Sequence, residues 1–251
     1  MSIFSAPCKE THILVVQHSE DVPGGNFCKG LSERGACLTF LRPMESDVLP
    51  ETPDDFDGLV VLGGSQHAWD DEYSPYFPHL MELMRLFDRD KKPVAGICLG
   101  CQLLARAYGG RLWTLDSLEF GFMEHSLTGE GEVDSVVGGV GLPALMEFHE
   151  DSFDLPAQAS LLVRGERCVN QCFKIGNASY GFQFHLEVDP IIVKRWIGLF
   201  RNGAMGNYRQ HLQHFDDDYF ENFSAKLAPF IVGSEEFCDR VSGRWLALAW
   251  Q

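Results

Sequence analysis

Apolar residues gather in four short runs within the first hundred positions, at 12–16, 37–41, 59–62 and 93–97. Their apolar positions are mostly consecutive rather than alternating, which is typical of strands buried on both faces of a parallel sheet. The segments between the runs are long enough to hold the crossover connections that parallel strands require. This part of the chain therefore predicts a parallel sheet.

Helical spacing fills several of the intervening segments. Apolar residues recur three and four positions apart between residues 78 and 90, and a second helical stretch spans residues 99–108. The second stretch is followed by Gly109 and Gly110, which are typical of a helix end. Strands that alternate with helices predict a doubly wound α/β fold of the flavodoxin-like kind.

The middle of the chain has a different pattern. Short β-like pieces, including 160–163 and 171–175, are separated by Gly and Pro. A hairpin around Gly176 and Asn177 leads into a further strand at 180–184, so we expect a small antiparallel β portion. Residues 190–200 return to helical spacing.

Beyond residue 203 the chain is rich in aromatic residues at helical spacing. These include Phe215, Tyr219, Phe220, Phe223, Phe237 and Trp245. Disordered segments contain few aromatic residues, and this much apolar surface needs a partner. We expect one domain over residues 1–203 and a helical extension over 204–251. The extension should pack on that domain or on a second subunit, which leaves a homodimer open.

Composition narrows the function. The chain has 251 residues with 20 Lys+Arg and 36 Asp+Glu, a formal charge of −16. Nucleic acids and anionic membrane surfaces attract basic patches, so this balance argues against both as partners. Residues 1–11 lack the pattern of a signal peptide, and no run approaches the ~20 apolar residues of a membrane span. Cysteines with apolar neighbours, such as Cys37, suggest reduced, core-filling thiols in a cytoplasmic protein.

The strongest chemical signal is a cysteine between two glycines at a strand-to-helix junction. Cys98 lies between Gly96 and Gly100. This spacing predicts a nucleophile elbow, in which a sharp turn pushes the side chain clear of the sheet and the following helix favours the thiolate. Two alternatives remain: Cys98 could be a core cysteine, or it could form a redox pair with Cys101.

A nucleophilic cysteine needs a base and a group that orients the base. His185 follows an apolar strand, and Glu187 lies two residues further on. In an extended segment both side chains lie on the same face, where the carboxylate can accept a hydrogen bond from the imidazole. A histidine after a strand is often only structural, but the cysteine elbow upstream favours the catalytic interpretation.

Gly63 and Gly64 follow the third apolar run and expose backbone N–H groups at the carboxyl edge of the sheet, where Cys98 is also expected. The N–H groups of Gly64 and Leu99 could form an oxyanion hole. Taken alone, two glycines at this place usually form no more than a turn.

Together these motifs resemble the class I glutamine amidotransferases, the triad type found in GMP synthase and its stand-alone relatives. The resemblance covers residues 12–200 and rests on five segments in the family's order: 63–64, 96–102, 119–121, 149–156 and 183–187. It implies an enzyme that hydrolyses the γ-amide of glutamine without metal or cofactor. It further implies a nucleophile, a base and an orienting carboxylate at Cys98, His185 and Glu187. Gly64 and Leu99 would form the oxyanion hole, and Gln102 and Gly63 would contact the substrate.

Three positions depart from the family's pattern. Leu186 stands where proline is usual between the catalytic residues, and Ser65 stands where many members have proline after the two glycines. Cys101 replaces a common His, Met or Gln, so a second thiol lies one helical turn from Cys98. We expect Cys101 to pack against the sheet, with a regulatory disulfide as the alternative.

The acceptor of the ammonia is not evident. The sequence holds no P-loop and no ATP-grasp or ATP-pyrophosphatase segment. Three functions stay open: a glutaminase that supplies a separate synthetase, a γ-glutamyl peptidase that acts alone on γ-glutamyl peptides, and a non-catalytic or redox-sensing binding protein. Retention of a cysteine, a histidine and a glutamate in the family's positions favours an enzyme.

Overall fold

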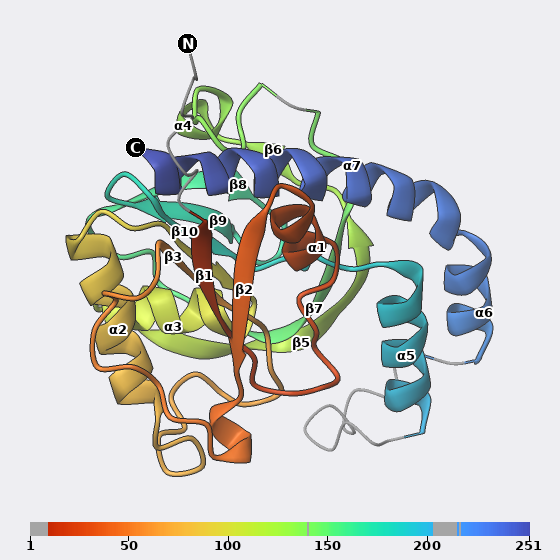
Figure 1. Cartoon of the computed structure of the whole chain (residues 1–251). Helices are drawn as coiled ribbons and strands as arrows, with labels where there is room; N and C mark the ends of the chain where they lie inside the picture. The colour runs from red at the N-terminus through yellow and green to blue at the C-terminus, as the bar shows by residue number, and fades with distance from the viewer. Residues whose placement is uncertain (1–9, 140, 203–214, 216) are drawn as a thin grey trace.

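A mixed sheet forms the centre of the computed structural model, which describes residues 10–139, 141–202, 215 and 217–251 (Figure 1). The strand order is β2-β1-β3-β4-β10-β9-β8-β6. Neighbours from β2 to β10 pair in parallel, and those from β10 to β6 pair antiparallel. The strands are β1 (Thr11–Val16), β2 (Ala36–Leu41), β3 (Gly58–Val61), β4 (Val94–Ile97), β6 (Ser126–Leu127), β8 (Ala159–Arg164), β9 (Asn170–Ile175) and β10 (Ser179–Phe182).

Helices cover both faces of this sheet, as expected for a doubly wound fold. On one face α2 and α3 pack through Leu80 and Leu104, whereas α1 and α7 pack on the other through Leu31 and Trp245. The helices are α1 (Gly25–Glu33), α2 (Phe77–Arg89), α3 (Leu99–Ala107), α4 (Gly129–Glu132), α5 (Pro190–Arg201), α6 (Asp217–Ala225) and α7 (Leu227–Leu246), with 3-10 turns at Pro43–Glu45 and Ala247–Trp250. No helix in these described ranges is both long and apolar enough to cross a membrane.

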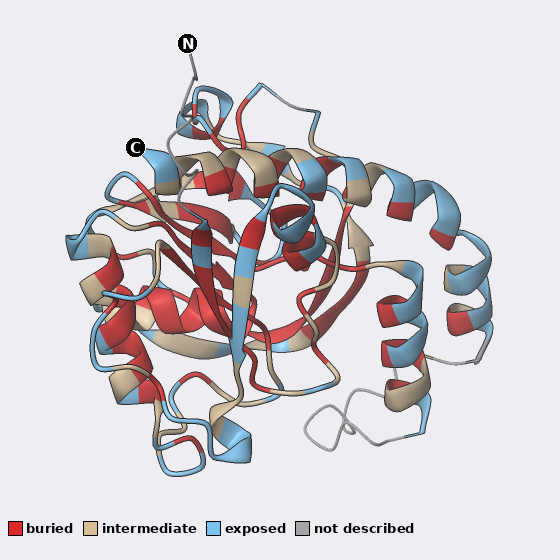
Figure 2. Cartoon of the chain, in the orientation of Figure 1, coloured by how far each residue is buried: buried red, intermediate tan, exposed pale blue. Residues whose placement is uncertain are grey.

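The small antiparallel β portion expected in the middle of the chain is confirmed, and part of it forms a second sheet. It pairs two long antiparallel strands, β5 (Leu112–Met123) and β7 (Leu145–Phe153). Every residue of β7 is buried (Figure 2). Apolar side chains of the ribbon, including Phe120 and Phe148, pack against α5 and α6 through Phe200 and Phe220. The β5–β7 ribbon therefore joins the C-terminal helices to the main domain.

The C-terminal helices belong to the packed body of the molecule. Trp245 of α7 is fully buried and its ring centroid lies 5.7 Å from that of Phe27 in α1. Tyr219 of α6 donates a hydrogen bond to the carbonyl of Phe120. Residues 203–214 lie outside the described residues, so the boundary at residue 203 stays a prediction.

The expectation that Cys37 fills the core is wrong. β2 is the edge strand of the sheet, and its residues are not buried throughout. Cys37 is exposed, with its Sγ 3.6 Å from Glu10 Oε2. An apolar run on an edge strand can face solvent, because no neighbouring strand or helix covers it.

Candidate active site

The junction of β4 and α3 forms the sharp turn expected around Cys98. Cys98 has φ 50° and ψ −107°, a left-handed backbone that an L-residue rarely adopts. A Cβ atom on Gly96 would lie 2.4 Å from the carbonyl oxygen of Gly100, and one on Gly100 would lie 2.1 Å from that of Val61. Only glycine fits at either position, which explains why Cys98 lies between two glycines.

Parallel pairing brings the separate motifs to one edge of the sheet. Gly96 of β4 pairs with Val61 of β3 on one side and with Gly181 of β10 on the other. The residues that follow these strands, including Gly64, Cys98 and His185, line a common cavity at their carboxyl ends. This is the edge at which doubly wound folds bind their ligands.

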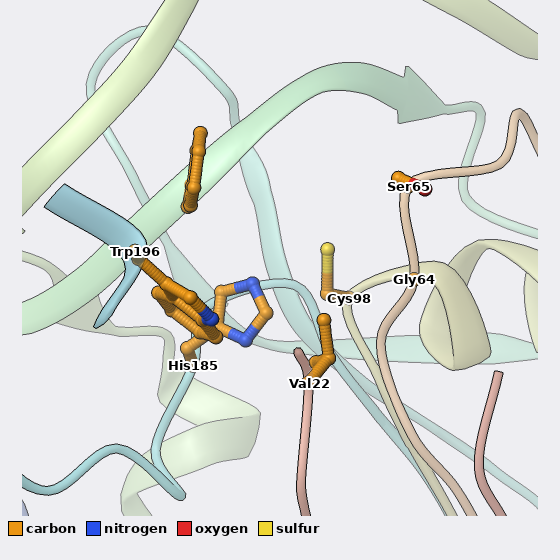
Figure 3. Close-up of a pocket in the computed structure, with 7 residues that line it drawn as sticks. Val22, Gly64, Ser65, Cys98, His185 and Trp196 are labelled. Atoms are coloured by element: carbon orange, nitrogen blue, oxygen red, sulfur yellow. The ribbon is translucent and has the colours of Figure 1, made fainter. Parts of the chain in front are cut away.

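His185 is held by two contacts. Its Nδ1 lies 2.7 Å from Glu187 Oε1, and its backbone N–H donates to the carbonyl of Met146 in β7 over 2.8 Å. The first contact turns the other ring nitrogen, Nε2, away from Glu187. Figure 3 shows the imidazole between the indole of Trp196 and the thiol of Cys98.

The surroundings of His185 favour its charged form. Burial alone lowers the pKa of His185, but the neighbouring Glu187 and Cys98 outweigh it through charge and hydrogen bonds and raise the pKa to about 10. A histidine with a raised pKa beside a thiol is suited to accept and hold a proton, as the base of a cysteine nucleophile must.

The cavity above Cys98 is small, with a volume of about 30 Å³. Two residues that line the cavity, Trp196 and Phe148, were not predicted from the sequence. Trp196 of α5 packs edge-on against His185 at 4.7 Å between ring centroids, and its indole N–H donates to the carbonyl of Asp21. The residues that line the cavity are Val22, Gly64, Ser65, Cys98, Phe148, His185 and Trp196.

The remaining residues singled out in the sequence lie near this cavity with different contacts. A Cβ atom on Gly63 would lie 3.2 Å from His185 Cε1, so Gly63 is in close contact with the imidazole. Leu99 is the first residue of α3, where a backbone N–H has no acceptor within the helix. Gln102 is buried, and its amide donates to the carbonyl of Asp151 and to Gln183 Oε1 over 3.2 and 3.1 Å. Gln102 does not line the cavity, and its contact with substrate stays a prediction.

Cys101 points away from the site. It is fully buried, and its Sγ lies 3.1 Å from where a Cβ on Gly181 of β10 would be. Burial raises the pKa of the Cys101 thiol well above its usual range. The thiol packs against the sheet, as expected, and the seven cysteines within the described ranges are all free.

Comparison with known proteins agrees with this geometry. The glutamine amidotransferase class-I family matches residues 23–192. The glutamine amidotransferase-like protein YfeJ of Salmonella typhimurium (strain LT2) is 33% identical over 176 residues, 68% of this chain and 74% of its own length. The chain therefore belongs to the class I glutamine amidotransferase family and is an enzyme of the cysteine-nucleophile hydrolase class.

Two further relatives extend the comparison. Gamma-glutamyl peptidase 3 of Arabidopsis thaliana is 30% identical over 174 residues, 66% of this chain and 69% of its own length. A crystal structure of a glutamine amidotransferase from Methylobacillus flagellatus superposes with a TM-score of 0.84 at 26% identity, covering 95% of each chain. The fold is thus that of the family along nearly the whole chain.

Proposed function

We propose that the protein hydrolyses the γ-amide of glutamine through Cys98, His185 and Glu187. His185 takes the proton of the Cys98 thiol, and the sulfur attacks the amide carbon. The N–H groups of Gly64 and Leu99 donate to the oxygen that becomes negatively charged. When the tetrahedral intermediate collapses, the C–N bond breaks and His185 returns its proton to the departing ammonia.

The second half of the reaction regenerates the cysteine. A γ-glutamyl thioester on Cys98 is attacked by water, whose proton passes to His185. The C–S bond then breaks, glutamate leaves, and the proton returns to the Cys98 sulfur. Glu187 holds the imidazole in one orientation through both halves and stabilises the imidazolium form.

One observation carries this proposal: the contact of 2.7 Å between His185 and Glu187 beside a cysteine held at φ 50°. A structural histidine requires no strained cysteine next to it, and strain of this kind collects at functional sites. The same contact disfavours a purely non-catalytic binding or redox-sensing role for Cys98.

Covalent labelling tests the assignment directly. A chloroketone analogue of glutamine should alkylate Cys98, and peptide mapping should find the label there and be blocked by excess glutamine. Cys37 is the internal control for simple exposure, because it is an exposed thiol. Labelling that settles on Cys37 or Cys168 and ignores glutamine would remove Cys98 from the proposed role.

The released ammonia would pass to a separate acceptor subunit. We therefore expect the isolated chain to hydrolyse free glutamine slowly. Without that subunit, the turn that carries Gly64 can misalign one oxyanion donor, and the loss of one donor lowers the rate by about 10²–10³. Turnover near the ~10 s⁻¹ of a typical enzyme by the chain alone would contradict this expectation.

A γ-glutamyl peptidase is the second candidate, favoured by the similarity to gamma-glutamyl peptidase 3. That activity uses the same residues but expels an amino acid or peptide amine instead of ammonia. Steady-state rates of the isolated chain on glutamine and on a γ-glutamyl peptide separate the two candidates.

A further inference from the structure

A second group of buried titratable side chains lies on the β5–β7 ribbon, away from the reaction. Glu147 and His149 lie two residues apart on β7 and so share a face, and Glu119 of β5 pairs directly with His149. Their side chains are at most 3% exposed. Phe148, between them on the opposite face, lines the cavity of Cys98. Cys168, in the turn between β8 and β9, completes the group and is also buried.

The donor atoms of this group gather around His149. His149 Nε2 lies 3.0 Å from Glu147 Oε2 and 3.1 Å from Glu119 Oε2. Cys168 Sγ, Glu119 and His149 offer ligand atoms that all lie within 4.8 Å of one another. Despite these short distances, none of the three nitrogen and oxygen atoms makes a well-aligned hydrogen bond within the described residues. Buried polar atoms without partners are costly, so something else must satisfy them.

The hydrogen bonding of His149 shows which of its ring nitrogens is available to a ligand. Its Nδ1 lies 2.9 Å from the carbonyl oxygen of Asp151, which can only accept, so Nδ1 carries a proton. Nε2 faces the two carboxylate oxygens, so three acceptor atoms meet in a buried place. They repel unless a cation, either a proton on Nε2 or a metal ion, lies between them. This tautomer, fixed by a backbone carbonyl, is the one that metal-binding histidines adopt.

We infer that Glu119, Glu147, His149 and Cys168 bind a divalent metal ion of the zinc type. Carboxylate, imidazole and thiolate are the zinc donors of proteins. Donors bound tetrahedrally at 2.0–2.2 Å are separated by about 3.4 Å, a few tenths of an ångström from the distances around His149 Nε2. Glu119, His149 and Cys168 would supply three donors. Glu147, 3.0 Å from His149 Nε2, would supply a fourth and close the coordination shell, as in structural rather than catalytic sites.

The surroundings meet the other requirements of a metal site. His125 Nε2 donates to the second oxygen of Glu147 over 2.7 Å, and Ser152 Oγ lies 3.2 Å from Cys168 Sγ. Such outer contacts orient the ligands of a bound metal. A cavity of about 250 Å³ reaches the group and provides a path of entry. The cavity is lined by buried and half-buried residues, Glu119, His125 and Gln171, and by exposed residues, Glu124, Glu166 and Arg167.

The ion would stabilise the strand on which the active site rests. Met146, next to Glu147, accepts the backbone hydrogen bond of His185, and Phe148 forms a wall of the Cys98 cavity. A metal that joins β5, β7 and the β8–β9 turn would therefore fix the position of His185 without touching the substrate.

Cobalt binding tests the site without using catalysis as a readout. The full-length protein is stripped with a chelator and titrated with Co²⁺ in the Cys37→Ser background, because Glu10, His12 and Cys37 form a second, exposed group of ligand type. We expect a thiolate-to-cobalt charge-transfer band. It should vanish in Cys168→Ser and persist in the matched control Cys238→Ser, which alters another buried thiol. His67, Glu150 and Asp151 are also grouped but contain no cysteine and give no such band.

Zinc affinity and thermal stability complete the test. Zn²⁺ should raise the midpoint of thermal unfolding of the stripped protein, and Glu147→Gln should weaken zinc binding at least about tenfold. If Cys168→Ser fails to fold, the weaker zinc binding of Glu147→Gln tests the site in its place. Absence of the band, its survival in Cys168→Ser, or a midpoint indifferent to zinc would overturn the inference. A proton on His149 Nε2 would then satisfy the carboxylates.

Discussion

Two buried histidines beside carboxylates, His185 and His149, differ in the nitrogen that the protein holds. In His185 the Nδ1 is bonded to the carboxylate of Glu187, and Nε2 is left for Cys98. In His149 the Nδ1 is bonded to a backbone carbonyl, and Nε2 is left facing two carboxylates. The same pair of residue types thus suits the proposed proton transfer at one place and the inferred cation binding at the other.

The two cysteines near these histidines differ in the same way. Cys98 stands on a strained turn at a cavity, beside an imidazole whose pKa is raised to about 10. Cys168 lies buried in the turn between β8 and β9, where burial raises the pKa of its thiol. Reactivity therefore depends on strain, access and the neighbouring proton acceptor, and not on the presence of a cysteine next to a histidine.

The largest effect should come from Cys98→Ser. We expect kcat for glutamine to fall about 10⁴-fold or more, since an alkoxide forms far less readily than a thiolate. Ammonia release under conditions where the unaltered protein is active measures this change. Cys37→Ser, at an exposed thiol away from the cavity, is the control and should keep full activity. A loss shared equally by both variants would show that the assay reports general damage.

Glu187→Gln should have the next largest effect. The amide can present its N–H₂ to the imidazole and favour the wrong tautomer, so we expect kcat to fall by about 10²–10⁴-fold with the fold intact. Glu51→Gln, whose side chain is 90% exposed, is the control. A rate within a factor of a few of the unaltered protein would make Glu187 a structural partner only, as in the cluster around His149.

Gly64→Ala should lower kcat with a smaller effect on KM. The added Cβ would lie 2.4 Å from Gln66 Oε1, 2.8 Å from Leu99 Cδ2 and 3.0 Å from His18 Cβ, so side chains on several sides must move. We expect this crowding to displace an oxyanion donor. Loss of one donor costs about 10²–10³ in kcat. Gly129→Ala, where a Cβ meets no atom within 4 Å, is the matched control. A rise in KM with unchanged kcat would assign Gly64 to ground-state binding instead.

The smallest effect should be on stability. The raised pKa of His185 predicts that the free energy of unfolding depends on pH over several pH units. Because the folded protein holds the proton more tightly than the unfolded chain, this stabilisation is complete below pH 6.5 and is lost as the pH rises to about 10. The slope from this group is at most about 1.4 kcal/mol per pH unit. Urea unfolding at several pH values, compared with His185→Asn, measures it. An identical slope in the variant would locate the titration elsewhere.

Much of the fold and the placement of Cys98, His185 and Glu187 could be predicted because local spacing encodes them. Apolar runs identified the strands of the main sheet, and glycines on either side of Cys98 identified the turn. Both signals report short-range geometry: a run buried on both faces, and a backbone that leaves no room for Cβ atoms. The position of Glu187 two residues after His185 predicted their contact for the same reason.

An antiparallel portion was predicted, but the two long strands of the β5–β7 ribbon were not located, because their sequence resembles exposed chain. Glu147, His149, Glu150 and Asp151 interrupt the apolar pattern of β7, yet all are buried. Charged residues can be buried only when opposite charges or ligands compensate them, and here the compensating groups come from elsewhere in the chain. Trp196 and Phe148 were missed likewise, since each looks like a core residue until α5 and β7 place it beside His185.

The sequence alone thus determined the order of strands and helices, the elbow at Cys98 and the histidine–glutamate pair, since each depends on neighbours within a few residues. Only the tertiary structure decided what the free ring nitrogen of each histidine meets. Both Nδ1 atoms are bonded two residues away, but Nε2 of His149 meets Glu119 through the register that places the two residues opposite each other across two strands. Pairing over such a distance follows from packing of the whole domain, which no local pattern records.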